Sequence, residues 1–390
     1  MTPPRHASHR FTPWARLSSF YLIYFAGLGA FVPYWSVYLE ALDFTPRQIG
    51  ELMAVVMATK VFAPYFWGWL ADRRGNRLAI VRWLTALAAA AFALIPLRHD
   101  YWWLLTSLAL FSFFWHAALP QFEAITLEYL GARRARYSHI RLWGSIGFIL
   151  AVTGMGFWLE RGDVRILPGV VALLMVLVWL STLLAPQDAS APPSGREGSI
   201  APVIRRPVVI AFLLGCLMMQ ASHGPYYTFF SVYLAGHGYS SGATGQLWAL
   251  GVVAEIGVFL LAHRWLPAIG APRLFILAAL ITAVRWLMIG ALVDHLAVLI
   301  LAQTLHAASY GLFHASAMEL LQRFFPASLQ GRGQALYAGI GFGVGNASGS
   351  LFAGHVWSGL GPSWAYYMAS GLCLIAAGLG IYVWRTVDGK

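Results

Sequence analysis

Apolar stretches of about 20 residues recur along the whole chain and are separated by short polar segments. A helix of this length spans a hydrocarbon core of roughly 30 Å. Of the 390 residues, 59% are hydrophobic and 11% are charged, whereas a soluble domain is usually about 25% charged. The sequence therefore predicts an all-α membrane protein in a lipid bilayer, with length for about twelve transmembrane helices.

The expected helices fall into two groups of six. We place them at residues 16–40, 46–70, 78–98, 101–130, 138–160, 164–185, 206–236, 240–266, 271–292, 296–320, 333–357 and 362–385. Between the groups, a segment rich in Pro, Ser and Gly is unsuited to spanning a membrane. The expected division is therefore a tail at 1–15, a six-helix bundle at 16–185, a linker at 186–206, a second bundle at 207–385 and a tail at 386–390.

The two groups resemble each other at a constant offset of 195 residues. The sequence Ser-Val-Tyr-Leu at 36–39 recurs at 231–234, and Gly29, Gly50 and Leu52 recur as Gly224, Gly245 and Leu247. A repeat of six helices preserves orientation, so the halves should be parallel and related by an axis along the membrane normal. This pseudo-symmetry predicts a central site between the halves.

The basic residues indicate the orientation in the membrane. Of the 26 Lys and Arg residues, 20 lie in the N-terminal segment, in alternate loops or at the C-terminus. By the positive-inside rule, both termini should be cytoplasmic. This topology explains the net charge of +11 better than nucleic-acid binding does. Both cysteines, Cys216 and Cys373, lie in apolar runs without metal-ligand spacing, so we expect neither a metal site nor a cofactor.

One carboxylate, Glu255, lies in the middle of an apolar run. A charge at this depth costs roughly 2.5–3.5 kcal/mol, so it is normally paired, protonated or directed into a water-filled cavity. The next run carries Arg285, and the following one carries His306, Tyr310 and His314 at a spacing of four, on one helical stripe. We expect these residues to share one polar layer, although each histidine could instead hydrogen-bond a neighbouring helix.

The first half carries a second set of polar residues. Lys60 lies midway along the second span without an acid at helical spacing, which suggests an anchor for an anion in the cavity; a lysine reaching toward the interface is the alternative. Glu123 lies in the fourth span and Arg141 at the start of the fifth, and His116 precedes Glu123 by seven residues on the same face. The acid and the arginine could also form a purely structural ion pair.

The segment between the second and third spans reads GWLADRRGNR, from Gly68 to Arg77. It resembles the cytoplasmic G-x-x-x-D-R-x-G-R-R/K signature of the major facilitator superfamily, whose gating residues would be Gly68, Asp72, Arg73, Gly75 and Arg77. Asn76 departs from the usual arginine, and the equivalent loop of the second half is degenerate. An ordinary positive-inside loop is the alternative.

Three further segments narrow the resemblance: YWSVYL at 34–39, RLWGS at 141–145 and WALGVVAE at 248–255. Together they look like the 3-phenylpropionate transporter branch of bacterial facilitators, which is similar to lactose permease and nucleoside:proton symporters. The resemblance covers residues 16–385. It implies the major facilitator fold of twelve transmembrane helices in two pseudo-symmetric bundles, a location in the bacterial inner membrane, and a monomer.

This resemblance also implies residue roles. In lactose permease an acid on helix 4 and an arginine on helix 5 meet at the sugar site, and charges on helices 8–10 couple transport to protons. Here the matching coupling residues would be Glu255, Arg285, His306 and His314. Of the expected substrate-binding residues, Glu123 and Arg141 match this sugar site. The others are expected from their positions in the spans: Lys60 and His116, and aromatic residues of the first and seventh spans that could line the cavity or simply pack, namely Tyr34, Trp35, Tyr226, Tyr227 and Phe230.

The sequence thus favours a proton-coupled transporter of a small organic solute. The mid-membrane bases from both halves suggest an anion, and we expect an aromatic carboxylate; a sugar or a nucleoside remains open because the acids could neutralise the arginines. A membrane enzyme is disfavoured since no H-E-x-x-H or P-loop motif is present. A transport-inactive sensor is disfavoured because no soluble signalling domain is evident.

Overall fold

The computed structural model describes residues 13–186 and 199–388, and this part of the chain is helical without any strand. The expected tails and linker therefore lie partly outside the described residues, at 1–12, 187–198 and 389–390. The helices of the first half are α1 (Pro13–Glu40), α2 (Pro46–Arg74), α3 (Arg77–Ala93), α4 (Tyr101–Leu130), α5 (Tyr137–Leu159) and α6 (Leu167–Leu184). Those that follow are α7 (Ala201–Ile204), α8 (Pro207–Ala221), α9 (Gly224–Gly236), α10 (Ser241–Ile269), α11 (Ala271–Ala291), α12 (Leu296–Thr304), α13 (Phe313–Phe324), α14 (Gln330–Tyr337), α15 (Asn346–Gly359) and α16 (Pro362–Val387).

Eleven helical segments of the described chain are long and apolar enough to cross a membrane. They match the expected spans except for the eleventh, at 333–357. That segment is helical, formed by α14, the π-helix η6 (Ala338–Gly345) and α15, but it is rich in glycine and falls outside the eleven. Its glycines face neighbouring helices, since a Cβ on Gly343 would meet Val61 and one on Gly345 would meet Leu217. The glycines of this span thus allow close packing against α2 and α8.

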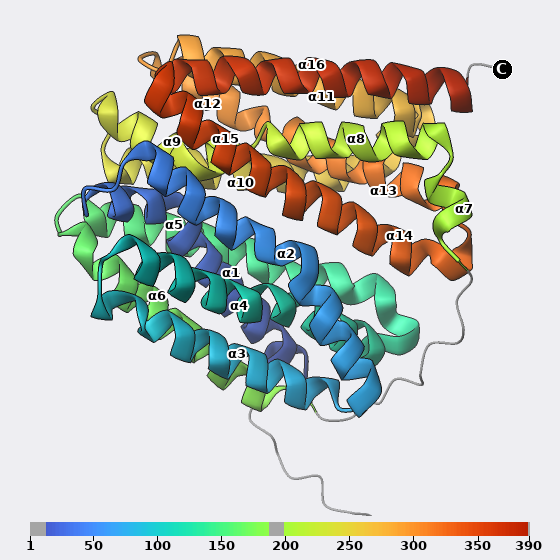
Figure 1. Cartoon of the computed structure of the whole chain (residues 1–390). Helices are drawn as coiled ribbons and strands as arrows, with labels where there is room; N and C mark the ends of the chain where they lie inside the picture. Colours follow the sequence, from blue (N-terminus) through green and yellow to red (C-terminus); the bar gives the residue numbers. More distant parts are fainter. Residues whose placement is uncertain (1–12, 187–198, 389–390) are drawn as a thin grey trace, which may run out of the picture.

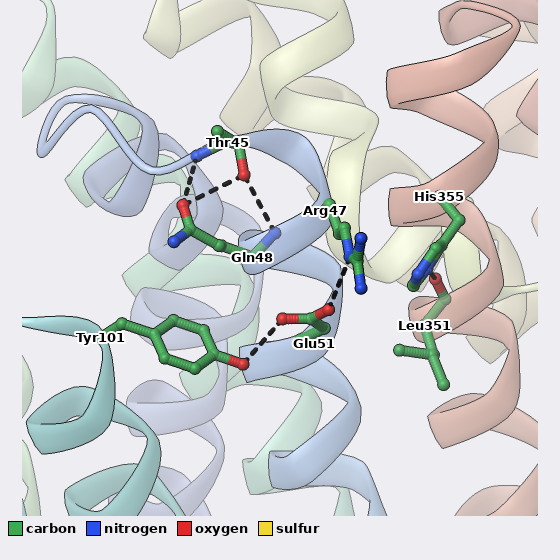
Figure 2. A network of polar contacts seen from close by, with 7 residues as sticks. All are labelled: Thr45, Arg47, Gln48, Glu51, Tyr101, Leu351 and His355. Atoms are coloured by element: carbon green, nitrogen blue, oxygen red, sulfur yellow. Dashed lines mark hydrogen bonds and ion pairs between the residues drawn. The ribbon is translucent and has the colours of Figure 1, made fainter.

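Local sequence sets where α2 begins and ends. The Thr45 side chain accepts a hydrogen bond from the Gln48 backbone N–H, and the Gln48 side chain accepts one from the Thr45 N–H at 3.0 Å, which is a capping box (Figure 2). Pro46 occupies the first helical position, where its missing N–H costs nothing. At the other end, Gly75 adopts a left-handed conformation with φ of 66° and terminates the helix.

The helices assemble as two groups (Figure 1). In the first half, α1 packs on α5 and α6, and α3 packs on α4; in the second half, α9 packs on α15, and α11 and α8 pack on α16. The groups meet along two main seams, α2 with α15 and α5 with α10, and α1 also packs against α9. The division into bundles at 16–185 and 207–385 stays a prediction, but the helices pack in an order that agrees with it.

The repeated glycines make equivalent contacts in the two halves. On α1, a Cβ on Gly29 would approach the Phe148 carbonyl oxygen of α5 to 2.6 Å, and its counterpart on α9, Gly224, is pressed in the same way against α15. On α2, Gly50 contacts α15, and its counterpart Gly245 on α10 contacts α5. The offset of 195 residues therefore marks positions where helix backbones approach too closely for a side chain.

The halves are in direct contact at one end of the bundle. We call it the distal end; it carries segments 41–45, 160–163, 237–240 and 360–361, and is opposite the end that carries residues 13 and 388. Here Gly50 of α2 faces Gly354 of α15, and the Tyr34 hydroxyl donates to the Val152 carbonyl at 2.7 Å and contacts the Ser241 carbonyl at 3.4 Å. Toward the other end, α2 and α14 diverge (Figure 1). The structure is thus closed at the distal end.

Three spans of the second half depart from regular α-helix. The seventh is interrupted at Ser222 and His223, between α8 and α9. The tenth contains the π-helix η4 (Ala307–Leu312), and the eleventh contains η6. The sequence did not predict these interruptions, which are common at functional sites.

Candidate substrate and coupling site

Glu255 lies on α10 and faces the tenth span, where its Oε2 is 3.9 Å from His306 Nε2. Both side chains are largely enclosed, with 17% of Glu255 and 8% of His306 exposed. Two glycines make this approach possible: a Cβ on Gly251 would lie 3.1 Å from the His306 ring, and one on Gly311 would lie 3.4 Å from Glu255 Cγ. The carboxylate is therefore held beside an imidazole, which can itself carry a proton.

Arg285, on α11, has no exposed surface and forms no ion pair with Glu255. Its Nε donates to the Ala302 carbonyl at 2.9 Å, and its guanidinium lies 4.4 Å from the ring centres of both Tyr226 and Trp286. Carbonyls in the last turn of a helix lack an intrahelical donor, and Ala302 lies in the last turn of α12. Among the residues expected to share one polar layer, Arg285 is thus bonded to a helix end and not to Glu255.

Gln303 links this arginine to an aromatic cluster. Its Oε1 accepts from the Tyr226 hydroxyl at 2.9 Å and from Arg285 Nη2 at 3.4 Å. The ring of Tyr226 lies 5.6 Å from that of His306. Arg285 and Glu255 are thus connected indirectly, through Tyr226 and His306.

In the first half, Glu123 of α4 and Arg141 of α5 form an ion pair of 4.0 Å between Oε1 and Nε. The Tyr137 hydroxyl donates to the same carboxylate oxygen at 3.0 Å, and the Arg141 guanidinium lies 3.9 Å from the centre of the Phe25 ring. About a third of each charged side chain is exposed, 33% for Arg141 and 35% for Glu123. This pair is more accessible than Arg285, which has no exposed surface.

Lys60, on α2, forms no ion pair with any carboxylate of residues 13–186 and 199–388. Its ammonium group contacts Met57 Sδ at 3.4 Å, and the side chain is partly buried. The neighbouring Thr59 hydroxyl is 2.9 Å from Nδ1 of His116 on α4. The structure therefore brings Lys60 near His116, whereas His116 does not bond Glu123.

The expected aromatic lining is divided among different places. Tyr34 lies at the distal seam, and Trp35 is fully buried among first-half aromatics. On α9, Tyr226, Tyr227 and Phe230 surround Trp248, and only Tyr227 of these three is partly exposed. The structure thus favours Tyr227 as a lining residue over the buried Trp35 and Phe230.

The segment from Gly68 to Arg77 forms an ion-pair network beside the turn between α2 and α3. Arg77 lies 2.6 Å from Asp72 Oδ1 and 3.0 Å from Glu128 Oε1 of α4. Asn76 caps α3, because its side chain accepts from the Ala79 N–H at 3.0 Å. The asparagine that departs from the superfamily signature thus has a structural role at this position.

Gly68 lies where α2 and α4 are close together. A Cβ at this position would lie 3.2 Å from the side chain of Gln121 on α4, so glycine allows the close approach of the two helices.

Comparison with known families decides the classification. The MFS_1 like family, a branch of the major facilitator superfamily, matches residues 14–368. The chain belongs to this family. The chain is 29% identical over 375 residues to a protein of Escherichia coli strain K12 named as a probable 3-phenylpropionic acid transporter, covering 92% of this chain and 94% of that one. It is 26% identical over 345 residues to the maltose permease of Geobacillus stearothermophilus, with 86% of each chain covered.

Solved structures show the same fold. A point mutant of the nucleoside transporter NupG superimposes with a TM-score of 0.85 at 16% identity, covering 95% of this chain and all of NupG. This facilitator is therefore a membrane transporter and not an enzyme. The expected major facilitator fold is confirmed.

Within this facilitator, the structure adds Gln303 to the site residues expected from sequence, and it places Tyr310, expected in the polar layer, between His306 and His314. The rings of His306, Tyr310 and His314 are stacked along the tenth span, with successive centroids 6.1 Å apart, and Nδ1 of His314 is 3.1 Å from the Tyr337 hydroxyl. Their spacing of four predicted one stripe. Gln303, in contrast, has only its polarity within an apolar run as a signal in the sequence.

Proposed function

We propose that this facilitator is a proton-coupled symporter of a small organic anion, with an aromatic carboxylate as substrate. The observation that carries this proposal is the separation of two kinds of charge. A carboxylate paired with an imidazole lies in the second half, and a lysine without a carboxylate partner among the described residues lies in the first. The first can exchange a proton and the second can hold an anion.

The pair of Glu255 and His306 supports the coupling role. Neither partner is permanently charged, so a proton can be added to or removed from the pair without leaving a fixed cation unpaired. An arginine partner would hold the carboxylate ionised. We therefore assign proton exchange to Glu255 and His306, and assign to Arg285 the task of positioning the tenth span through Ala302 and Gln303.

Lys60 and Arg141 support an anionic substrate. An incoming carboxylate would provide Lys60 with a counter-charge, and the planar guanidinium of Arg141 can donate two parallel hydrogen bonds. Phe25 and Tyr227 supply aromatic surface in the two halves. The named activity of the Escherichia coli relative agrees with this substrate class.

A sugar or a nucleoside is the second candidate, favoured by one observation. Glu123 is within 4.0 Å of Arg141, so this base is already neutralised. The relatives named as maltose permease and nucleoside transporter show that the fold accepts neutral solutes. The two candidates differ in whether Lys60 is needed.

Alternating access follows from the two-bundle arrangement. We propose that the bundles at 16–185 and 207–385 rock about the central site, and that the Asp72–Arg77 segment controls the end opposite the distal end. With both termini cytoplasmic, the distal end faces the periplasm and this structure represents a state closed to it. We further propose that the protein functions as a monomer in the bacterial inner membrane, with no cofactor.

Solute uptake by purified protein in liposomes tests the proposal. Phenylpropionate, a β-galactoside and uridine would be offered to the wild type, Lys60→Met and Lys60→Arg. We expect phenylpropionate counterflow in the wild type, loss in Lys60→Met and retention in the charge-conserving control Lys60→Arg. Better transport of a neutral solute, or unimpaired phenylpropionate transport by Lys60→Met, would contradict the anion assignment. Absence of counterflow for all three would leave the coupling proposal without a substrate and count against it.

A further inference from the structure

At the distal end, the side chain of Glu160 reaches from the first half to the second. Its Oε1 accepts hydrogen bonds from the Ser240 hydroxyl and from the Gly242 backbone N–H, the latter at 3.2 Å. Ser240 is the N-cap of α10, and its side-chain oxygen accepts from the Ala243 N–H at 3.1 Å. The carboxylate thus lies against the N-terminus of α10, where unpaired N–H groups and the helix dipole favour a negative charge.

The helix to which Glu160 belongs does not explain this position. Glu160 is the C-cap of α5, where the dipole disfavours an acid. Its hydrogen-bond partners are Ser240 and Gly242 of the second half. The stabilisation of this carboxylate therefore comes from the other half and is present only while the halves touch.

The seam is shaped for this contact. A Cβ on Gly242 would lie 2.5 Å from Glu160 Oε1, and one on Gly156 would lie 2.6 Å from the Ser241 carbonyl oxygen. Glycine on each side of the seam allows α5 and α10 to come close enough for the carboxylate to reach the helix end.

Another acid toward this end, Glu51 of α2, provides a contrast. Its carboxylate accepts hydrogen bonds from the Tyr101 hydroxyl at 2.7 Å and from Arg47 at 3.0 Å, and both partners lie in the first half (Figure 2). Across the α2–α15 seam, His355 bonds the carbonyl of Leu351 in its own helix. Glu51 would therefore keep its hydrogen bonds if the halves separated, whereas Glu160 would lose them.

We propose that Glu160 is a latch between the halves: it stabilises the state closed at the distal end by capping α10, and it is released when that end opens. Glu160 is exposed, so solvent screens the interaction. The latch should favour the closed state by about threefold to tenfold over a protein that lacks it.

Distances between spin labels across the distal end test the latch in the full-length protein. Labels at His99→Cys, in the segment between α3 and α4 at the distal end, and at Leu360→Cys report opening because both positions are exposed and lie in opposite halves. The native Cys216 and Cys373 are buried and should resist labelling. Glu160→Gln keeps the size of the side chain and removes its charge. We expect its longer-distance population to rise about threefold to tenfold, and the matched control Glu51→Gln to resemble the parent.

Two further measurements keep the proposal open to refutation if Glu160→Gln folds poorly. Ser240→Ala should shift the population in the same direction. In the parent protein, raising the ionic strength from about 0.01 M to 1 M shortens the screening length from roughly 30 Å to 3 Å and should also favour opening. Equal distance distributions for the parent, Glu160→Gln and Ser240→Ala, or a shift in Glu51→Gln alone, would overturn the latch. None of these measurements uses a transported solute, so a failure of the substrate proposal would not affect them.

Discussion

The pairing of charges in the membrane predicts how many protons accompany each substrate. Glu255 is paired with His306, which can lose its charge, whereas Glu123 is paired with Arg141, which cannot. Of these two pairs, only Glu255–His306 can therefore exchange a proton, which gives one proton per transport cycle. A monocarboxylate carried with one proton moves no net charge across the membrane.

This stoichiometry gives two magnitudes. One pH unit provides about 1.36 kcal/mol per proton, so it should support about tenfold accumulation of the anion. A potential of 100 mV is worth about 2.3 kcal/mol per elementary charge. It should not change the accumulation of the anion, because the anion and its proton together carry no net charge. For a neutral solute carried with one proton, the same potential would instead support about 50-fold accumulation.

Accumulation in proteoliposomes checks these values, with the potential set by a potassium gradient and valinomycin and the pH gradient set independently. Glu255→Gln should abolish uphill accumulation while exchange of labelled for unlabelled solute continues, because exchange need not pass through the deprotonated empty carrier. Glu319→Gln is the control, since Glu319 forms an exposed pair with Arg323. Undiminished pH-driven accumulation by Glu255→Gln would refute the assignment, and potential-driven accumulation of the anion would refute the stoichiometry.

Three further predictions concern stability. Arg285→Lys should lower the free energy of unfolding by about 2–4 kcal/mol, since lysine cannot reproduce both the bond to Ala302 and the contacts with two rings; a thermal melt within about 1 kcal/mol of wild type would contradict this. Gly224→Ala should cost at least about 1–3 kcal/mol because its Cβ would overlap the Gly349 backbone, whereas Gly236→Ala, which meets open space, should be tolerated in the same melt. Arg77→Gln should cost only about 1 kcal/mol, because its two ion pairs are partly exposed; a loss of several kcal/mol would show that the network is stronger than its exposure implies.

The helical architecture could be predicted from the sequence because the bilayer leaves the backbone few alternatives. Every backbone N–H and C=O in the hydrocarbon region must be paired within its own segment, so a run of apolar residues long enough to span becomes a helix. The fourth span was expected at 101–130 and is Tyr101–Leu130. The repeat of Gly29 and Gly50 at a fixed offset also indicated the pseudo-symmetry, because close helix contacts require glycine wherever the two halves reuse them.

The depth of the charged residues could also be predicted, but their partners could not. Position along a helix fixes depth, and spacing by four fixes a stripe, which brought His306 and His314 to one side of the tenth span. Which residue on another helix meets that stripe depends on the rotation and separation of the helices. Close packing at Gly251 and Gly311 brings Glu255 to His306, while Arg285 is drawn to the end of α12.

The tertiary structure alone decided where the spans depart from regular α-helix and how the two halves meet at Glu160. The interruption at Ser222 and His223 and the π-helices η4 and η6 arise where spans pack against neighbours, and hydropathy does not distinguish them from regular helix. The contact of Glu160 with the N-terminus of α10 joins residues 80 apart in sequence. Sequence by itself determined which segments cross the membrane and at what depth each charge lies, since both follow from local composition and helix geometry. The tertiary structure alone decided which charges meet, because that depends on how closely separate helices approach.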